Sequence, residues 1–209
     1  FIFFIFSNIF SLIIFKLNDY IFSPLVCLIF ILIIGVSHGS LDHVKGKRLF
    51  EILNINQFYL FYMIYILIAF FVIIIWISIP SISLMFFLIV SSYHFGKEDT
   101  QFLINKSSTL NFFLYFLKGL LIILAPLFFH FSETVEIFKF LLVENEAFYL
   151  ALAFIETSKI IIIGIILSSL ASVFLFVKKF EIKKFAIFLD YFSILILNYY
   201  LSPLLAFTV

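Results

Sequence analysis

The chain consists of apolar segments separated by short polar ones. A membrane-spanning helix needs about 20 mostly apolar residues, and several segments approach or reach that length. Seven of them follow one another, at 1–15, 21–42, 58–79, 81–96, 109–130, 159–177 and 185–201. We therefore predict an all-α fold, a polytopic transmembrane helical bundle with about six to seven membrane segments in a single domain over 1–209.

The polar segments predict how these helices connect. Pro80 follows segment 58–79 at once, so this segment and 81–96 should form a tight helical hairpin, and the second helix can extend to about Thr100. Residues 43–57 are predicted to be a polar loop. Residues 132–158 contain five glutamates and are predicted to include an amphipathic helix at the membrane interface.

Composition points to a lipid environment. The sequence is 65% hydrophobic and 12% charged, whereas soluble domains are about 45–50% apolar and about 25% charged. A net charge of +1 gives no reason to expect a nucleic-acid partner. The single cysteine, Cys27, excludes an internal disulfide and a cysteine metal cluster, and we expect it to be a small buried apolar residue.

Basic residues predict the orientation. Three Lys and Arg lie in 43–57, two in 97–108 and four in 178–184, so nine of the 13 fall in alternate loops. The positive-inside rule places these loops in the cytoplasm. We expect a multi-pass protein of the cytoplasmic (inner) membrane, with the lipid bilayer as its partner.

The two ends of the sequence are unusual. Residue 1 is Phe rather than Met, and an apolar segment that starts at Pro203 has only six further residues. We therefore expect a domain truncated at both ends.

Two histidines are candidate metal ligands. His38 and His94 lie near the cytoplasmic ends of segments 21–42 and 81–96, which run in the same direction. Imidazoles at matched depth can share a metal ion, although a lone histidine at an interface is also a common polar anchor. His43 adjoins basic residues and His130 lies at the opposite end of its segment, so neither is expected to complete the site.

Each candidate histidine has glycine and a carboxylate nearby. The first motif is Gly35-Val-Ser-His38-Gly39-Ser-Leu-Asp42, and the second is His94-Phe95-Gly96-Lys-Glu-Asp99. Asp42 lies one helical turn after His38, and Asp99 can approach His94 if the helix loosens at Gly96. Both are candidates to hold a ligand's second ring nitrogen or a bound water, or they simply flank the loops.

Two further charges lie within apolar segments. Lys118 should either extend its side chain to the interface or find a partner across the bundle, and Asp190 should pair with a polar neighbour. For Lys118 either of these roles is favoured over catalysis.

These motifs resemble those of the Brp/Blh family of membrane β-carotene 15,15'-dioxygenases, G-x-x-H-G-x-x-D and H-F-G-x-x-D. The closing Ser202-Pro-Leu-Leu-Ala-Phe-Thr208 is similar to the stretch that leads to the family's third motif, a histidine pair. The resemblance implies an oxygenase that uses dioxygen and non-haem Fe(II), held by four histidines, to cleave β-carotene into two all-trans retinal molecules. It makes His38 and His94 two of the ligands and puts the others after Val209.

The resemblance also implies that the truncated chain alone is inactive and that its retinal passes to a rhodopsin-type protein. Two alternatives stay open from the residues themselves. One is a transporter or permease in which His38 and His94 relay protons, and the other is a structural or assembly protein of the membrane.

Overall fold

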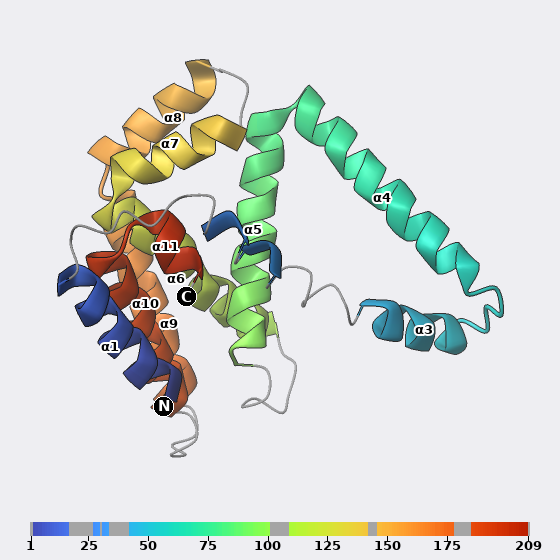
Figure 1. The fold of residues 1–209 in the computed structure, drawn as a ribbon, viewed down its shortest axis with the longest axis horizontal. Coiled ribbons are helices and arrows are strands. Elements are labelled where there is room, and N and C mark those ends of the chain that lie inside the picture. The colour runs from blue at the N-terminus through green and yellow to red at the C-terminus, as the bar shows by residue number, and fades with distance from the viewer. Residues whose placement is uncertain are drawn as a thin grey trace.

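Every regular element in the described part of the chain is a helix. The computed structural model describes residues 2–16, 27–29, 31–33, 42–100, 109–141, 146–177 and 185–208. Its helices are shown in Figure 1: α1 (Ile2–Lys16), α3 (Asp42–Ile52), α4 (Tyr59–Ser78), α5 (Pro80–Glu98), α6 (Thr109–Phe129), α7 (Phe131–Leu141), α8 (Glu146–Thr157), α9 (Ile160–Val177), α10 (Phe185–Tyr200) and α11 (Pro203–Thr208). The all-α prediction is confirmed.

The α4–α5 hairpin forms as predicted. Pro80 is the first residue of α5, a position where its missing N–H costs no hydrogen bond. Ile79 between the two helices has φ −141° and ψ 64° and still donates its N–H to the carbonyl of Ile75 at 2.9 Å. Helix α5 continues without a break to Glu98, so the extension beyond Gly96 is also confirmed.

The predicted loop at 43–57 is wrong over much of its length, because Asp42 begins helix α3. Its first-turn carboxylate complements the positive end of the helix dipole. The buried ring of Phe50 meets the rings of Phe58 and Phe61 edge-on, at 6.3 and 6.2 Å. Asn54, with φ 56°, follows the end of the helix. Aromatic packing thus stabilises a helix whose average polarity suggested a loop.

The described residues contain fewer clear membrane spans than the six to seven predicted. Helices α4 and α6 are long and apolar enough, and α8 with α9, bent by 69°, form a third if counted as one span. Helices α1 and α10 have only 15 and 16 residues. Helix α5 is less apolar because it contains serines, His94 and Lys97. Predicted segment 21–42 lies mostly outside the described residues.

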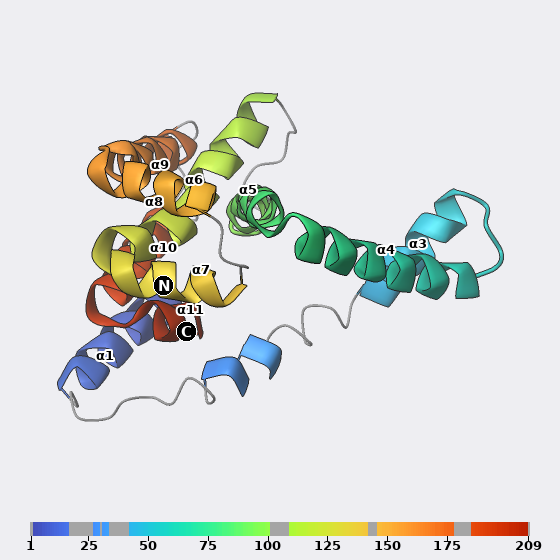
Figure 2. The same ribbon diagram turned by 90° about the horizontal axis from the view of Figure 1, so that it is seen from above.

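Helix α6 is the centre of the bundle. It packs against α5, α9 and α10, and its residues Leu121 and Ala125 form a buried cluster with Tyr191 of α10. Helix α4 has no buried residues and extends away from the other helices together with α3 (Figures 1 and 2). Cys27 is 2% exposed and packs against Leu197, Leu201 and Leu205, so its prediction as a buried apolar residue is confirmed.

The two ends of the bundle differ. Helices α7 and α8 lie together at the upper end in Figure 1, near the α4–α5 turn, whereas α5 and α9 end and α6 and α10 begin at the lower end. Trp76 Nε1 donates to the carbonyl of Leu141 at 2.9 Å and links α4 to the end of α7. The predicted segment 132–158 therefore contains two helices.

Candidate functional site

His94 lies on α5, on the side that faces away from α6. Ser92 and Gly96 are both buried against α6, and His94 is two residues from each, so it lies on the opposite side of the helix. Its imidazole is exposed, and the ring centroid is 5.8 Å from that of Phe95. The side chain is therefore accessible to a ligand that approaches α5 from outside the α5–α6 pair.

Gly96 of the second motif has a packing role. A Cβ atom at Gly96 would collide with the carbonyl oxygen of Tyr115, and one at Gly119 would collide with the carbonyl oxygen of Ser92. The two antiparallel helices therefore cross backbone on backbone, which small residues allow. Glycine in this motif sets how closely α5 approaches α6, at the same level along the helix as His94.

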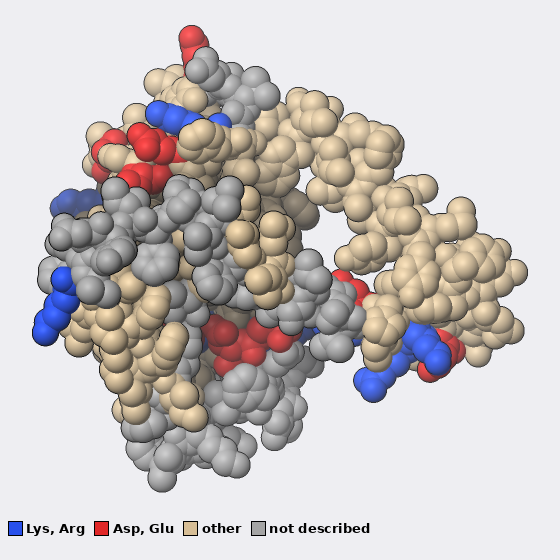
Figure 3. Space-filling model, viewed as in Figure 1, with Lys and Arg blue, Asp and Glu red and all other residues tan. Residues whose placement is uncertain are grey.

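A charged cluster lies beside this crossing, since Lys118 adjoins Gly119. Lys118 on α6 is 3% exposed, and its Nζ donates to Oδ2 of Asp99 at 2.8 Å and to Oδ2 of Asp190 at 2.7 Å. The two carboxylates are 33% and 28% exposed. Figure 3, which has the same view as Figure 1, shows acidic side chains gathered near the middle of the face towards the viewer, beside the lower half of α5. The cluster is thus buried around its cation and reachable at its carboxylates.

Lys118 also connects to a fourth helix. The hydroxyl of Ser168 on α9 donates to the backbone carbonyl of Lys118 at 3.3 Å, and Ser168 is fully buried. One residue of α6 is therefore hydrogen-bonded to α5, α9 and α10. The sequence predicts a partner across the bundle for Lys118 and a polar neighbour for Asp190. Both predictions are confirmed, because Lys118 and Asp190 pair with each other.

The two carboxylates that were predicted to support the histidine ligands have other contacts. Asp99 lies on the Ser92–Gly96 side of α5, because five residues of regular helix turn it by about 140° from His94. The loosening at Gly96 that would bring Asp99 to His94 is not present. Asp42 accepts a hydrogen bond from the hydroxyl of Tyr65 at 3.3 Å.

The meeting of His38 and His94 stays a prediction, since His38 lies outside the described residues. Within the described ranges no group of three His, Cys, Asp or Glu side chains is placed to hold a metal. His43 is exposed on α3. His130 follows the far end of α6, about 18 Å from Lys118 by the helix rise, with its Nδ1 3.8 Å from Oε1 of Glu133.

The sequence matches the family described as beta-carotene 15,15'-dioxygenase over residues 29–209, most of the chain and both histidine motifs. The chain belongs to the β-carotene 15,15'-dioxygenase family. Comparisons with curated proteins and with solved structures gave no match. The resemblance seen in the motifs is therefore confirmed at the level of the family.

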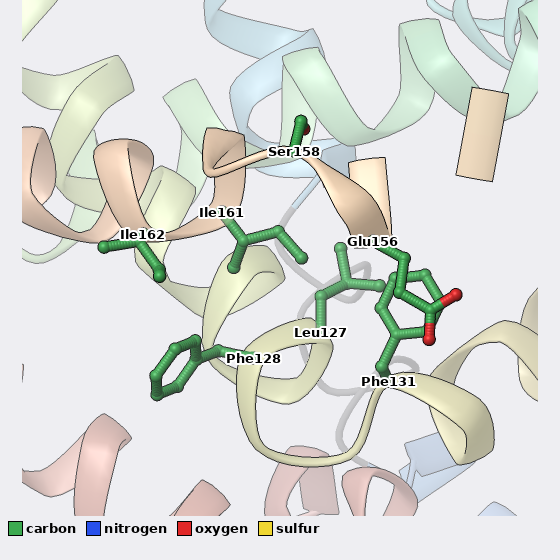
Figure 4. Close-up of a pocket in the computed structure, with 7 residues that line it drawn as sticks. All are labelled: Leu127, Phe128, Phe131, Glu156, Ser158, Ile161 and Ile162. Carbon is green, nitrogen blue, oxygen red and sulfur yellow. The ribbon is translucent and has the colours of Figure 1, made fainter. Parts of the chain in front are cut away.

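A pocket lies at the other end of the helical bundle in this dioxygenase-family chain (Figure 4). It has a volume of about 210 Å³ and is lined by Leu127, Phe128, Phe131, Glu156, Ser158, Ile161 and Ile162. These residues come from the end of α6, the start of α7 and the bend between α8 and α9. The pocket is remote from His94, because α5 and α6 are antiparallel and His94 lies level with residues 115–119.

Sequence reasoning missed that Asp99, Lys118 and Asp190 form one unit in this dioxygenase-family chain. The available signal was the high cost of an unpaired charge within an apolar segment, which predicted partners for Lys118 and Asp190. The short motif that contains both Asp99 and His94 instead predicts that Asp99 supports His94. Because α5 is a continuous helix, its twist between His94 and Asp99 places the aspartate on the opposite side of the helix.

Proposed function

We propose that the complete protein cleaves the central double bond of β-carotene with dioxygen to give two molecules of all-trans retinal. The observation that carries this proposal is the family match over residues 29–209, which includes both histidine motifs. The family implies β-carotene as the substrate and a dioxygenase as the type of enzyme. The retinal is proposed to pass to a rhodopsin-type protein.

Four histidines are proposed to hold Fe(II): His38, His94 and a pair in a segment after Val209. The exposed imidazole of His94 fits such a role, because it is free of the charged cluster and neutral imidazole is a suitable ligand for ferrous iron. The iron with dioxygen supplies the oxidative chemistry when bound. Two histidines leave the ligand set incomplete, so we propose that residues 1–209 alone are inactive.

The chain's own contribution is positioning and the exclusion of water. Asp42, at the start of α3, is proposed to orient His38 or a bound water. Asp99 is proposed to act on His94 through α5, since its carboxylate contacts Lys118. Exclusion of water from the site would suppress competing hydrolysis and proton leakage.

The proposed location is the cytoplasmic (inner) membrane, crossed several times. Helices α5, α9 and α10 pack directly on α6, which is long and apolar enough to span a bilayer. They are proposed to lie in the membrane with it, despite their shorter apolar lengths. A water-insoluble polyene such as β-carotene then reaches the site from the lipid.

The test is a colour assay in bacterial cells that accumulate β-carotene and express the complete protein. We expect the parent to bleach the cells and form retinal, and His38→Ala and His94→Ala to leave them coloured. His130→Ala is the matched control and should bleach normally, because His130 lies at the opposite end of α6. Bleaching by His38→Ala or His94→Ala at the parent's rate would overturn the ligand assignment.

A permease in which histidines relay protons predicts a different result. The parent would then leave β-carotene intact, form no retinal and carry a solute together with protons. That outcome would reject the oxygenase and favour transport.

A further inference from the structure

The close contact between α5 and α6 fixes the distance between the two helices more tightly than it fixes the rotation of α5 about its own axis. Gly96 and Gly119 have no side chains, and each meets backbone atoms of the other helix. Interlocked side chains normally fix how one helix is rotated against another. At the contact between Gly96 and Gly119 itself they are absent, and one turn away the ring of Tyr93 on α5 packs 4.4 Å from that of Phe112 and 6.4 Å from that of Tyr115. Helix α4, on which α5 also packs, has no buried residues.

Asp99 adds a directional polar restraint to this apolar contact. It lies on the same side of α5 as Gly96, close to the helix end, and its Oδ2 is bound at 2.8 Å by a cation that is 3% exposed. That cation is bound in turn by Asp190 of α10 at 2.7 Å. A charge-assisted hydrogen bond is about twice as strong as a neutral one. Because Asp190 also holds the Lys118 ammonium, rotation of α5 about its axis lengthens or misaligns the bond between Lys118 and Asp99.

We propose that Lys118 is a positioning residue, which fixes the rotation of α5 through Asp99 and Asp190 and so holds His94 in the direction that the metal site needs. The proposal rests on the proposed function, in which His94 is an iron ligand. It assigns Asp99, Lys118 and Asp190 to the site without any contact to iron or substrate.

The size of the effect follows from helix geometry. A side chain ends about 5–6 Å from the helix axis, so a rotation of about 10° moves the imidazole by about 1 Å. A misplacement of about 1 Å can cost about a hundredfold in rate. A modest loosening of α5 is therefore enough to impair catalysis while the fold is retained.

The decisive variant is a neutral triple, Asp99→Asn, Lys118→Met and Asp190→Asn, made in the complete protein. It removes the bridging charges together, so that no unpaired charge stays buried and the protein can fold. Glu98→Gln is the matched control, because Glu98 is an exposed carboxylate on the same turn of α5. We measure kcat and KM for retinal formation, iron content, and the EPR spectrum of nitric oxide bound to Fe(II).

A second measurement reports the position of α5 independently of activity. Spin labels at Lys97→Cys on α5 and Phe192→Cys on α10, both exposed, give a distance distribution in a Cys27→Ala background. We expect a broader distribution for the neutral triple than for the parent or Glu98→Gln. We also expect a ten- to hundredfold lower kcat, little change in KM and an altered nitrosyl spectrum.

Either half of that expectation can fail. An unchanged distance distribution would overturn the proposal, because the cluster would not restrain α5. A broader distribution with the parent's kcat and spectrum would also overturn it, since rotation of α5 would not matter to the metal. If the parent itself forms no retinal and binds no iron, the proposed function fails, and the distance measurement alone decides whether the cluster restrains α5.

Discussion

Nζ of Lys118 on α6 lies 2.7 Å from Oδ2 of Asp190 on α10, 72 residues further along the chain. The same Nζ lies 2.8 Å from Oδ2 of Asp99 on α5. One buried cation therefore binds two carboxylates, which come from two helices far apart in the sequence. Burial of any of these charges without the others costs several kcal/mol, so the stability of the bundle depends on their being kept together.

Lys118→Met should destabilise the protein more than the neutral triple does. The single substitution leaves two carboxylates facing an apolar side chain, whereas the triple leaves no charge. We expect the single variant to lose about 3 kcal/mol, the low end for removal of one partner from a buried ion pair, because both carboxylates are partly exposed. Thermal unfolding of the detergent-solubilised protein measures the difference.

Lys97→Met is the control for the loss of a lysine, because Lys97 is exposed. Its Nζ makes one long contact, 5.8 Å from the centroid of the Tyr93 ring. It should change stability by less than about 1 kcal/mol. A Lys118→Met protein as stable as Lys97→Met would show that the cluster does not contribute to the fold as described.

Gly96→Ala should separate α5 from α6 and destabilise the protein. The new methyl group would collide with the carbonyl of Tyr115, a backbone atom that cannot move without its helix. Overpacking of this kind typically costs about 1–3 kcal/mol. Gly164→Ala on α9 is the matched control, because its methyl group would meet the side chain of Leu124, most closely its terminal Cδ1 atom, and no backbone atom among its nearest neighbours.

Thermal unfolding of the two alanine variants in the same detergent provides the comparison. We expect the midpoint to fall clearly for Gly96→Ala and to change little for Gly164→Ala. Equal midpoints for both variants would mean that the close crossing at Gly96 and Gly119 is not tightly packed.

The sequence was sufficient to predict most helices because apolar length is a strong signal in a membrane protein. Segments 58–79, 109–130, 159–177 and 185–201 correspond to α4, α6, α9 and α10 with ends that differ by only one residue. The proline at position 80 marked the start of α5. Helix α3 was missed, since its stability comes from aromatic contacts of Phe50 that polarity averages do not contain.

The candidate site was less predictable because it depends on which side of a helix each residue occupies. The motif containing His94 and Asp99 suggested one site, but its two polar residues lie on different sides of a continuous α5. The partner of Asp99 lies on α6 and the partner of Lys118 lies on α10. Such three-helix relationships depend on packing, and a single sequence contains no direct signal of them.

The topology gives a third prediction, which concerns opposite ends of the bundle. Lys97 lies at the end of α5 where basic residues concentrate, and Glu133 lies on α7 beyond the far end of α6. Both side chains are exposed. In a Cys27→Ala background, Glu133→Cys should react with a membrane-impermeant maleimide in intact spheroplasts, whereas Lys97→Cys should react only after the membrane is permeabilised.

The expected asymmetry has a physical origin in the distribution of charge. Nine of the 13 Lys and Arg lie in polar segments that alternate with less basic ones, and short basic segments between membrane spans are retained in the cytoplasm. His94 lies on the same end of α5 as Lys97, so labelling also locates the proposed metal site near the cytoplasmic surface. Reaction of Lys97→Cys in intact spheroplasts, with protection of Glu133→Cys, would invert the topology and place that site near the outer surface.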